Sequence, residues 1–270
     1  MTILSRRRGA RAPRVVATPL LVLVFATTAI CTSCGGCNKK APPKSEPTLP
    51  AAQAPAKETV LPSSPTNVVR VPHTPKPPKI DGEITEFNEA GGTGWFVGVD
   101  GLEAHPASEA RFMWDDKNLY LGLYAADQDI EVHVTKHDEP VWTDDSFRMR
   151  LATLDDPKHP YAIDINAKGV VADAKRLDNG KMDLSWESHI DLKVGIDEDQ
   201  TINDSKDDDE EWTVEAALPW SSIGVVPKPG TIISIDVKRC DTPKGGATVC
   251  GTFGQAPDGS LVGRLELLPP

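Results

Sequence analysis

The chain of 270 residues is long enough for one large or two small domains, but only 39% of it is apolar and it contains 24 prolines. This composition excludes a chain that is globular throughout, so part of it is expected to stay unfolded. Residues 80–270 contain 17 Lys and Arg against 38 Asp and Glu, a net charge of −21, which disfavours binding of nucleic acid by the folded part.

The first 37 residues have the pattern of an export signal. Five arginines precede an uncharged apolar run, Leu20–Ile30, which is too short to span a bilayer as a helix. Cys34 follows small residues, as the acylated cysteine of a bacterial lipoprotein does. We therefore predict a lipoprotein-type signal with lipidation at Cys34, and a protein exported to the cell envelope, in the periplasm or at the cell surface. An ordinary secretory signal is the alternative, because Cys31 stands where the lipoprotein pattern has leucine.

Residues 38–67 are predicted to be a linker. Eleven of the 24 prolines fall between Asn38 and Lys79, among Ala, Ser, Thr and Lys, with no aromatic residue. Such a segment cannot bury enough apolar surface to offset the entropy of ordering it. It is expected to be an extended spacer between the membrane and a folded domain.

Residues 68–270 are predicted to fold as an all-β domain. Short apolar runs alternate with period two and are bounded by turn residues, which is typical of strands with one buried face. Such strands need a second sheet to cover that face, so we expect one antiparallel β-sandwich. Helical spacing is limited to single turns near residues 83–90 and 221–224. The clearest runs are Phe112–Trp114, Leu119–Leu123, Phe147–Leu151, Tyr161–Ile165, Trp212–Leu218 and Ile233–Val237.

Five stretches of this region, in order, resemble a family-nine carbohydrate-binding module, a β-sandwich that binds sugars. The resemblance implies a non-catalytic domain without a cofactor, although members of the family often hold structural calcium. The five stretches are Ile80–Glu83 with Phe87, Ala110–Leu121, Trp142–Phe147, Trp212–Trp220 and Val262–Leu267.

The resemblance also implies where a sugar would bind. In the sugar-binding members two tryptophans sandwich a terminal sugar, and Trp142 lies in a segment similar to the one that carries the first. The loop before the last strand, which carries the second, has Phe253 as its only aromatic residue. Plain packing at a strand edge suits Trp142 equally well. The predicted carbohydrate-binding residues are Trp142, Asp144, Asp145, Arg148 and Tyr161.

Two further features concern ions and disulfides. Asp127 and Asp129 are candidate ligands of a metal ion, because calcium prefers several carboxylate oxygens. The acidic run at residues 197–211 matches no defined calcium loop, and a solvated loop is favoured there. Cys240 and Cys250 flank a turn between two predicted strands, and an exported location is oxidising, so a disulfide is predicted. Two buried free thiols are the alternative.

The folded region contains no nucleophile elbow, zinc-protease motif or phosphate-binding loop. We therefore expect a protein that is not an enzyme. Its predicted partners are a glycan or polysaccharide and, through the lipid anchor, the membrane. The alternatives are a scaffold or protein-interaction lipoprotein that has lost sugar binding, and an accessory part of a glycan-degrading system.

Overall fold

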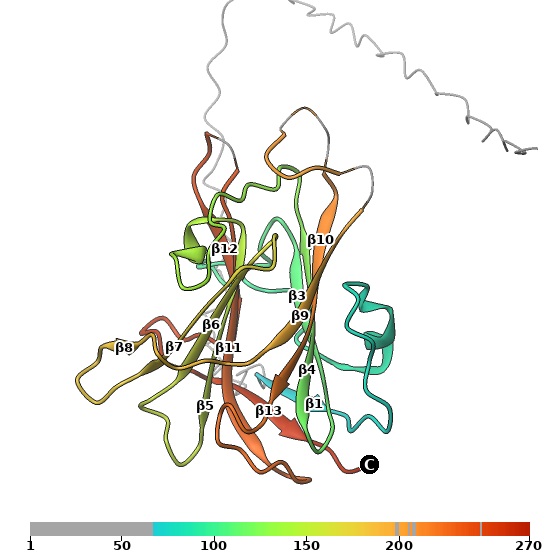
Figure 1. Cartoon of the computed structure of the whole chain (residues 1–270), viewed down its shortest axis with the longest axis vertical. Coiled ribbons are helices and arrows are strands. Elements are labelled where there is room, and N and C mark those ends of the chain that lie inside the picture. The colour runs from blue at the N-terminus through green and yellow to red at the C-terminus, as the bar shows by residue number, and fades with distance from the viewer. Residues whose placement is uncertain (1–66, 198–199, 205, 207–208, 244) are drawn as a thin grey trace, which may run out of the picture. The chain divides into compact units, whose positions relative to one another are not determined.

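The computed structural model describes residues 67–197, 200–204, 206, 209–243 and 245–270. Their strands form two sheets that pack face to face as a β-sandwich, which confirms the predicted fold (Figure 1). Among these residues there is no helix with the length and apolar character that crossing a membrane requires. The predicted signal, its Cys34, and the predicted linker up to residue 66 lie outside the described residues.

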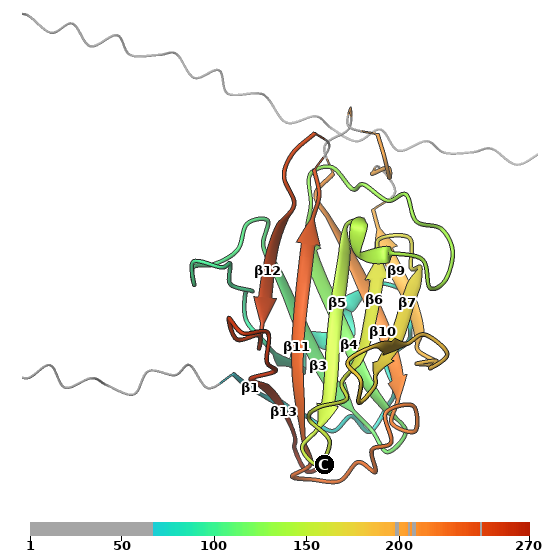
Figure 2. The same cartoon turned by 90° about the vertical axis from the view of Figure 1, so that its left-hand side faces the viewer.

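The first sheet has eight strands, and Figure 2 shows it from its outer side. Seven strands follow the order β1-β13-β11-β5-β6-β7-β8, and β12 pairs with β11. All pairs are antiparallel except β1 with β13, which is parallel. The strands are β1 (Val68–Val71), β5 (Ser146–Thr153), β6 (Tyr161–Asn166), β7 (Val171–Arg176), β8 (Met182–Asp183), β11 (Ile232–Asp241), β12 (Val249–Phe253) and β13 (Gly263–Leu267).

The second sheet has five strands in the order β2-β3-β4-β10-β9, all antiparallel. Two 3-10 helices lie outside the sheets, η1 (Ile84–Glu89) and η2 (Val141–Thr143). η1 falls in the first of the two regions for which a single helical turn was expected. The strands are β2 (Gly91–Gly92), β3 (Ser108–Trp114), β4 (Asn118–Ala126), β9 (Asp191–Ile196) and β10 (Glu211–Pro219).

The core lies between the two sheets and follows the alternation of the sequence. In β5, Phe147, Met149 and Leu151 point inward and are buried, while Arg148 and Arg150 point outward. Trp114, Trp212 and Trp220 are at most 2% exposed and belong to this core. Burying a large apolar side chain of this kind stabilises the fold by about 2–3 kcal/mol. The outer face of the eight-stranded sheet is thus left mainly for polar side chains. On the outer face of the five-stranded sheet, Phe87 of η1 packs on Met113, Tyr120 and Ala217 in a second, smaller apolar cluster.

A disulfide joins Cys240 of β11 to Cys250 of β12, as predicted. The two residues lie directly opposite each other in the antiparallel ladder, with Cα atoms 4.2 Å apart. The bond therefore joins the two strands at the end of the hairpin where β11 leads into β12.

Candidate functional site

Trp142 lies on the outer face of the eight-stranded sheet. It is the middle residue of η2, which packs against β5 and β6, and Val141 before it is fully buried. This buried neighbour fixes the turn, so the indole is held at the surface with 52% of its area exposed. The guanidinium carbon of Arg148 lies 5.5 Å from the centroid of the Trp142 ring, within cation–π range.

Arg148 connects the indole to a set of charged side chains on the same face. Its Nε donates to Asp164 of β6 at 2.6 Å, and Lys238 of β11 is opposite Arg148 in the ladder. Asp164 is buried, which raises the pKa of its carboxyl group, while the charges of Arg148 and Lys238 oppose that rise. The site thus combines one exposed aromatic ring with a carboxylate, a guanidinium and an ammonium group.

Asp144 and Asp145, both predicted to bind sugar, lie below the surface and are at most 1% exposed. Asp144 accepts hydrogen bonds from the backbone of His133 and Val134 and from the side chain of Asn166. The two oxygens of Asp145 accept from the backbone N–H groups of residues 131 and 242, each at 2.6 Å. Both carboxylates thus hold the segment between β4 and β5 in place, and neither is placed beside Trp142 as a surface acceptor.

Tyr161, the remaining predicted sugar-binding residue, lies on the other side of its sheet. It is opposite Leu151, so it points toward the core, and its ring centroid is 4.7 Å from that of Trp186. Lys175 lies over its ring with Nζ 4.9 Å from the centroid. The structure therefore brings Trp142 and Arg148 together and separates them from Tyr161.

A second aromatic wall does not face Trp142 among the described residues. Phe253 of β12 is opposite Val237 and packs against the core. Trp95 is 48% exposed, but its ring centroid lies 6.0 Å from that of Tyr124 of β4, so it belongs to the outer face of the five-stranded sheet. Its indole and that of Trp142 therefore lie on different sheets and cannot enclose one sugar.

A pocket of about 780 Å³ lies on the outer face of the eight-stranded sheet, and its lining includes Arg150, which is two positions from Arg148 in β5. Its floor comes from Arg150 of β5, Ser234 of β11 and Arg264 of β13. Its walls come from the loops at residues 154–160, 177–180 and 258–261. The last of these loops precedes the final strand, where the family resemblance implies the second aromatic wall, and here it contributes polar groups instead.

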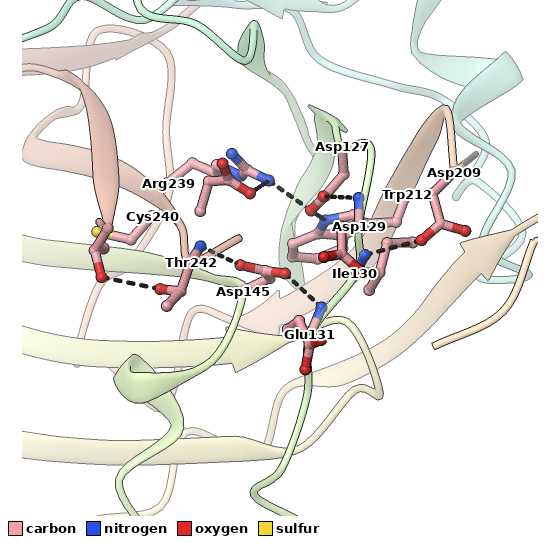
Figure 3. A network of polar contacts seen from close by, with 12 residues as sticks. Asp127, Asp129, Ile130, Glu131, Asp145, Asp209, Trp212, Arg239, Cys240 and Thr242 are labelled. Carbon is pink, nitrogen blue, oxygen red and sulfur yellow. Dashed lines mark hydrogen bonds and ion pairs between the residues drawn. The ribbon is translucent and has the colours of Figure 1, made fainter. Parts of the chain in front are cut away.

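The predicted metal ligand Asp127 belongs to a buried polar network at one end of the sandwich (Figure 3). Arg239 donates to Asp127 at 2.6 Å and to Asp241 at 3.2 Å, and Trp212 donates its indole N–H to Asp127. One oxygen each from Asp127, Asp145 and Asp241 could reach a common ion. The guanidinium of Arg239 supplies one positive charge to these three carboxylates, and a metal ion at Asp127 or Asp129 stays a prediction.

Three residues of the outer face were missed at the sequence level: Asp164, Asp236 and Lys238. Asp164 and Asp236 lie between buried apolar neighbours, and Lys238 lies between the buried Val237 and Arg239, so the alternation placed all three outward. It gave no reason to join them with Trp142. The pairing register of β5 with β6 and β11 brings them together. The signal that could have indicated the site is a charged residue at every second position of a strand, as Arg148 and Arg150 are in β5. The same spacing recurs in β11 with Asp236 and Lys238.

The fold and this exposed indole define a β-sandwich of the carbohydrate-binding type. Residues 80–259 match the family described as carbohydrate family 9 binding domain-like, and the chain belongs to that family. A search of the curated proteins found no match.

Solved structures with the same fold include a family 9 carbohydrate-binding module from Caldicellulosiruptor kristjanssonii in complex with cellotriose. It is 16% identical, with a TM-score of 0.52 over 75% of this chain and 94% of that chain. The same kind of module from that organism in complex with glucose is 15% identical, with a TM-score of 0.50 over 75% and 95%. A proposed carbohydrate-binding protein from Bacteroides uniformis is 13% identical, with a TM-score of 0.55 over 74% and 98%.

Proposed function

We propose that this protein binds a glycan on the outer face of its eight-stranded sheet and carries out no reaction of its own. The observation that supports this most is the half-exposed indole of Trp142 beside the ion pair of Arg148 and Asp164. An aromatic ring next to hydrogen-bonding groups suits a sugar, which has an apolar ring face and polar hydroxyl groups at its rim. The two Caldicellulosiruptor kristjanssonii structures, which contain cellotriose and glucose, support this class of ligand.

Energetics explain why the charged neighbours matter. One indole face that covers about 100 Å² of sugar removes about that area on each partner, worth about 5 kcal/mol. Association costs at least about 4 kcal/mol, so one ring alone gives binding weaker than millimolar. The cations of Arg148 and Lys238 supply the hydrogen-bond donors that a single ring lacks, and buried Asp164 holds Arg148 in place.

The test compares Trp142→Ala with Trp95→Ala in titration calorimetry of the full chain with xylo- and cello-oligosaccharides. We expect Trp142→Ala to lower the affinity at least tenfold, because it removes the stacking surface. Trp95→Ala is the matched control, since it removes an equally exposed indole from the other sheet. Equal effects of the two substitutions, or no heat with any oligosaccharide, would favour the scaffold function instead.

We further propose that the protein is exported and anchored by a lipid on Cys34, so that it holds the glycan near the membrane. The five arginines, the apolar run and the small residues before Cys34 support this. Metabolic labelling with a fatty acid tests it: wild-type protein should take up the label and sediment with membranes, and Cys34→Ala should do neither. Label that persists in Cys34→Ala would contradict the assignment.

A further inference from the structure

The outer face of the eight-stranded sheet carries a group of bases, two of which, Arg148 and Arg150, form ion pairs with Asp164 and Asp236 of the same face. Residues 80–270 contain 17 bases and 38 acids, yet six of those bases lie on this one face, in strands or in the walls of the pocket. Four of the six line the pocket, so a ligand bound there meets more cations than acids. The six bases are Arg148, Arg150, Lys158, Arg176, Lys238 and Arg264.

The 780 Å³ pocket is where the guanidinium groups converge. Arg150, Arg176 and Arg264 come from β5, β7 and β13, three strands that are far apart in the sequence, and all three line the pocket. Lys158 adds a fourth cation from the loop between β5 and β6, whereas the acids in the lining are Asp178 and Asp258. The lining thus has twice as many permanent cations as acids.

The contacts of these arginines leave hydrogen-bond donors for a ligand. Asp236 engages Nε and Nη2 of Arg150, and the backbone carbonyls of residues 261 and 263 accept from Nη1 of Arg264. Each guanidinium carries five N–H donors in a planar fork, so neither is saturated by these contacts. Arg176 is exposed at the end of β7. A planar anion such as a carboxylate matches such donors in a bidentate geometry.

The pocket adjoins the proposed sugar platform. Arg148, over the Trp142 ring, and Arg150, in the pocket floor, are both outward-facing residues of β5, two positions apart. Two residues along a strand span about 7 Å, so one oligosaccharide can contact both. Resting on the glycan-binding function proposed above, we infer that the ligand is an anionic glycan whose sugars carry carboxylate or sulfate groups, with those groups bound by Arg150, Arg176 and Arg264.

The experiment titrates the full chain with a galacturonate tetramer and with its fully methyl-esterified form, which has the same backbone without the charge. A sulfated cello-oligosaccharide, set against the unsulfated one, distinguishes sulfate from carboxylate as the preferred anion. We expect at least one anionic ligand to bind at least tenfold more tightly than its neutral counterpart, with an affinity that falls as salt is added. Equal affinities for charged and neutral forms would overturn the inference.

Substitutions locate the effect. Arg176→Gln removes an exposed cation of the pocket and should lower the affinity for the preferred anionic ligand at least threefold without changing that for the neutral one. Arg264→Gln should act in the same direction. Lys193→Gln is the matched control, because it removes one exposed cation from β9 of the other sheet. An equal loss in Lys193→Gln and Arg176→Gln would overturn the inference.

The two proposals fail in different ways. Binding of neutral and acidic ligands with equal affinity, lost in Trp142→Ala, would keep the glycan-binding function and reject the anionic ligand. An absence of binding by all the oligosaccharides would reject both.

Discussion

At the scale of single residues, Arg239 is a cation that the fold has buried among acids. It is 2% exposed and contacts Asp127 and Asp241, and Asp145 lies next to Asp127 in the same cluster. Burial and the charge of Asp127 raise the pKa of Asp145 to about 7, and burial also raises the pKa of Asp241. Removal of the guanidinium would leave these carboxylates without a neutralising charge.

We therefore predict that Arg239→Met destabilises the domain by about 3–5 kcal/mol at pH 7.5, the usual cost of breaking a buried ion pair. The loss should be smaller at pH 5.5, where Asp145 and Asp241 can take up protons instead. Urea denaturation at both pH values measures it. Arg111→Met serves as the control, since Arg111 pairs with Glu109 on an outer face and should cost at most about 1 kcal/mol. An equal loss at the two pH values would contradict the role of Arg239 as a counter-charge.

At the scale of elements, the β11–β12 hairpin depends on its disulfide. Cys240 and Cys250 are separated by 10 positions, and closing a loop of this length stabilises a fold by about 3 kcal/mol in the chain-entropy model. We predict that the double substitution of both cysteines by serine lowers the free energy of unfolding by about that amount. Urea denaturation with and without a thiol reductant measures it: the reductant should weaken wild-type protein and leave the double variant unchanged. A double variant as stable as the oxidised wild type would refute the prediction.

The strands also show which parts of the fold can be predicted from the sequence and which cannot. The strands β5, β6 and β10 were predictable, because one buried face imposes alternation on each of them. The parallel pairing of β1 with β13 was not predictable, since alternation fixes the face that a strand buries but not its direction or its neighbour.

For the site, the sequence left the exposure of Trp142 open, and Asp144 and Asp145 were expected to face a sugar. Their backbone partners, such as the N–H of residue 242, lie up to 97 positions away, and no local pattern reports such contacts.

At the scale of the whole molecule, buried carboxyl groups link stability to pH. Burial raises the pKa of Glu215 to about 7, as it does for Asp145. The Oε2 atom of Glu215 accepts from the N–H groups of Asp81 and Gly82, whereas its Oε1 atom is buried without a hydrogen-bond partner in the described part of the chain. A proton on that oxygen would remove a buried charge. In the folded protein the neutral form of these acids is therefore favoured relative to the unfolded chain.

The sign follows from the two pKa values of each group. Between about pH 4, near the unfolded value, and pH 7, near the folded one, the folded state binds more protons than the unfolded state, so stability falls as pH rises. We predict a higher free energy of unfolding at pH 5 than at pH 8, measured by urea denaturation at one-unit steps.

The net charge of −21 in residues 80–270 adds a general repulsion of the same sign, so a variant must separate the two causes. Glu215→Gln keeps an oxygen that can accept from Asp81 and Gly82 but cannot ionise, and it should flatten the slope. Glu89→Gln, an exposed acid at the end of η1, removes the same charge and should leave the slope in place. If both variants keep the slope of unfolding free energy against pH, the pH dependence comes from overall charge. A higher stability at pH 8 than at pH 5 would contradict the prediction.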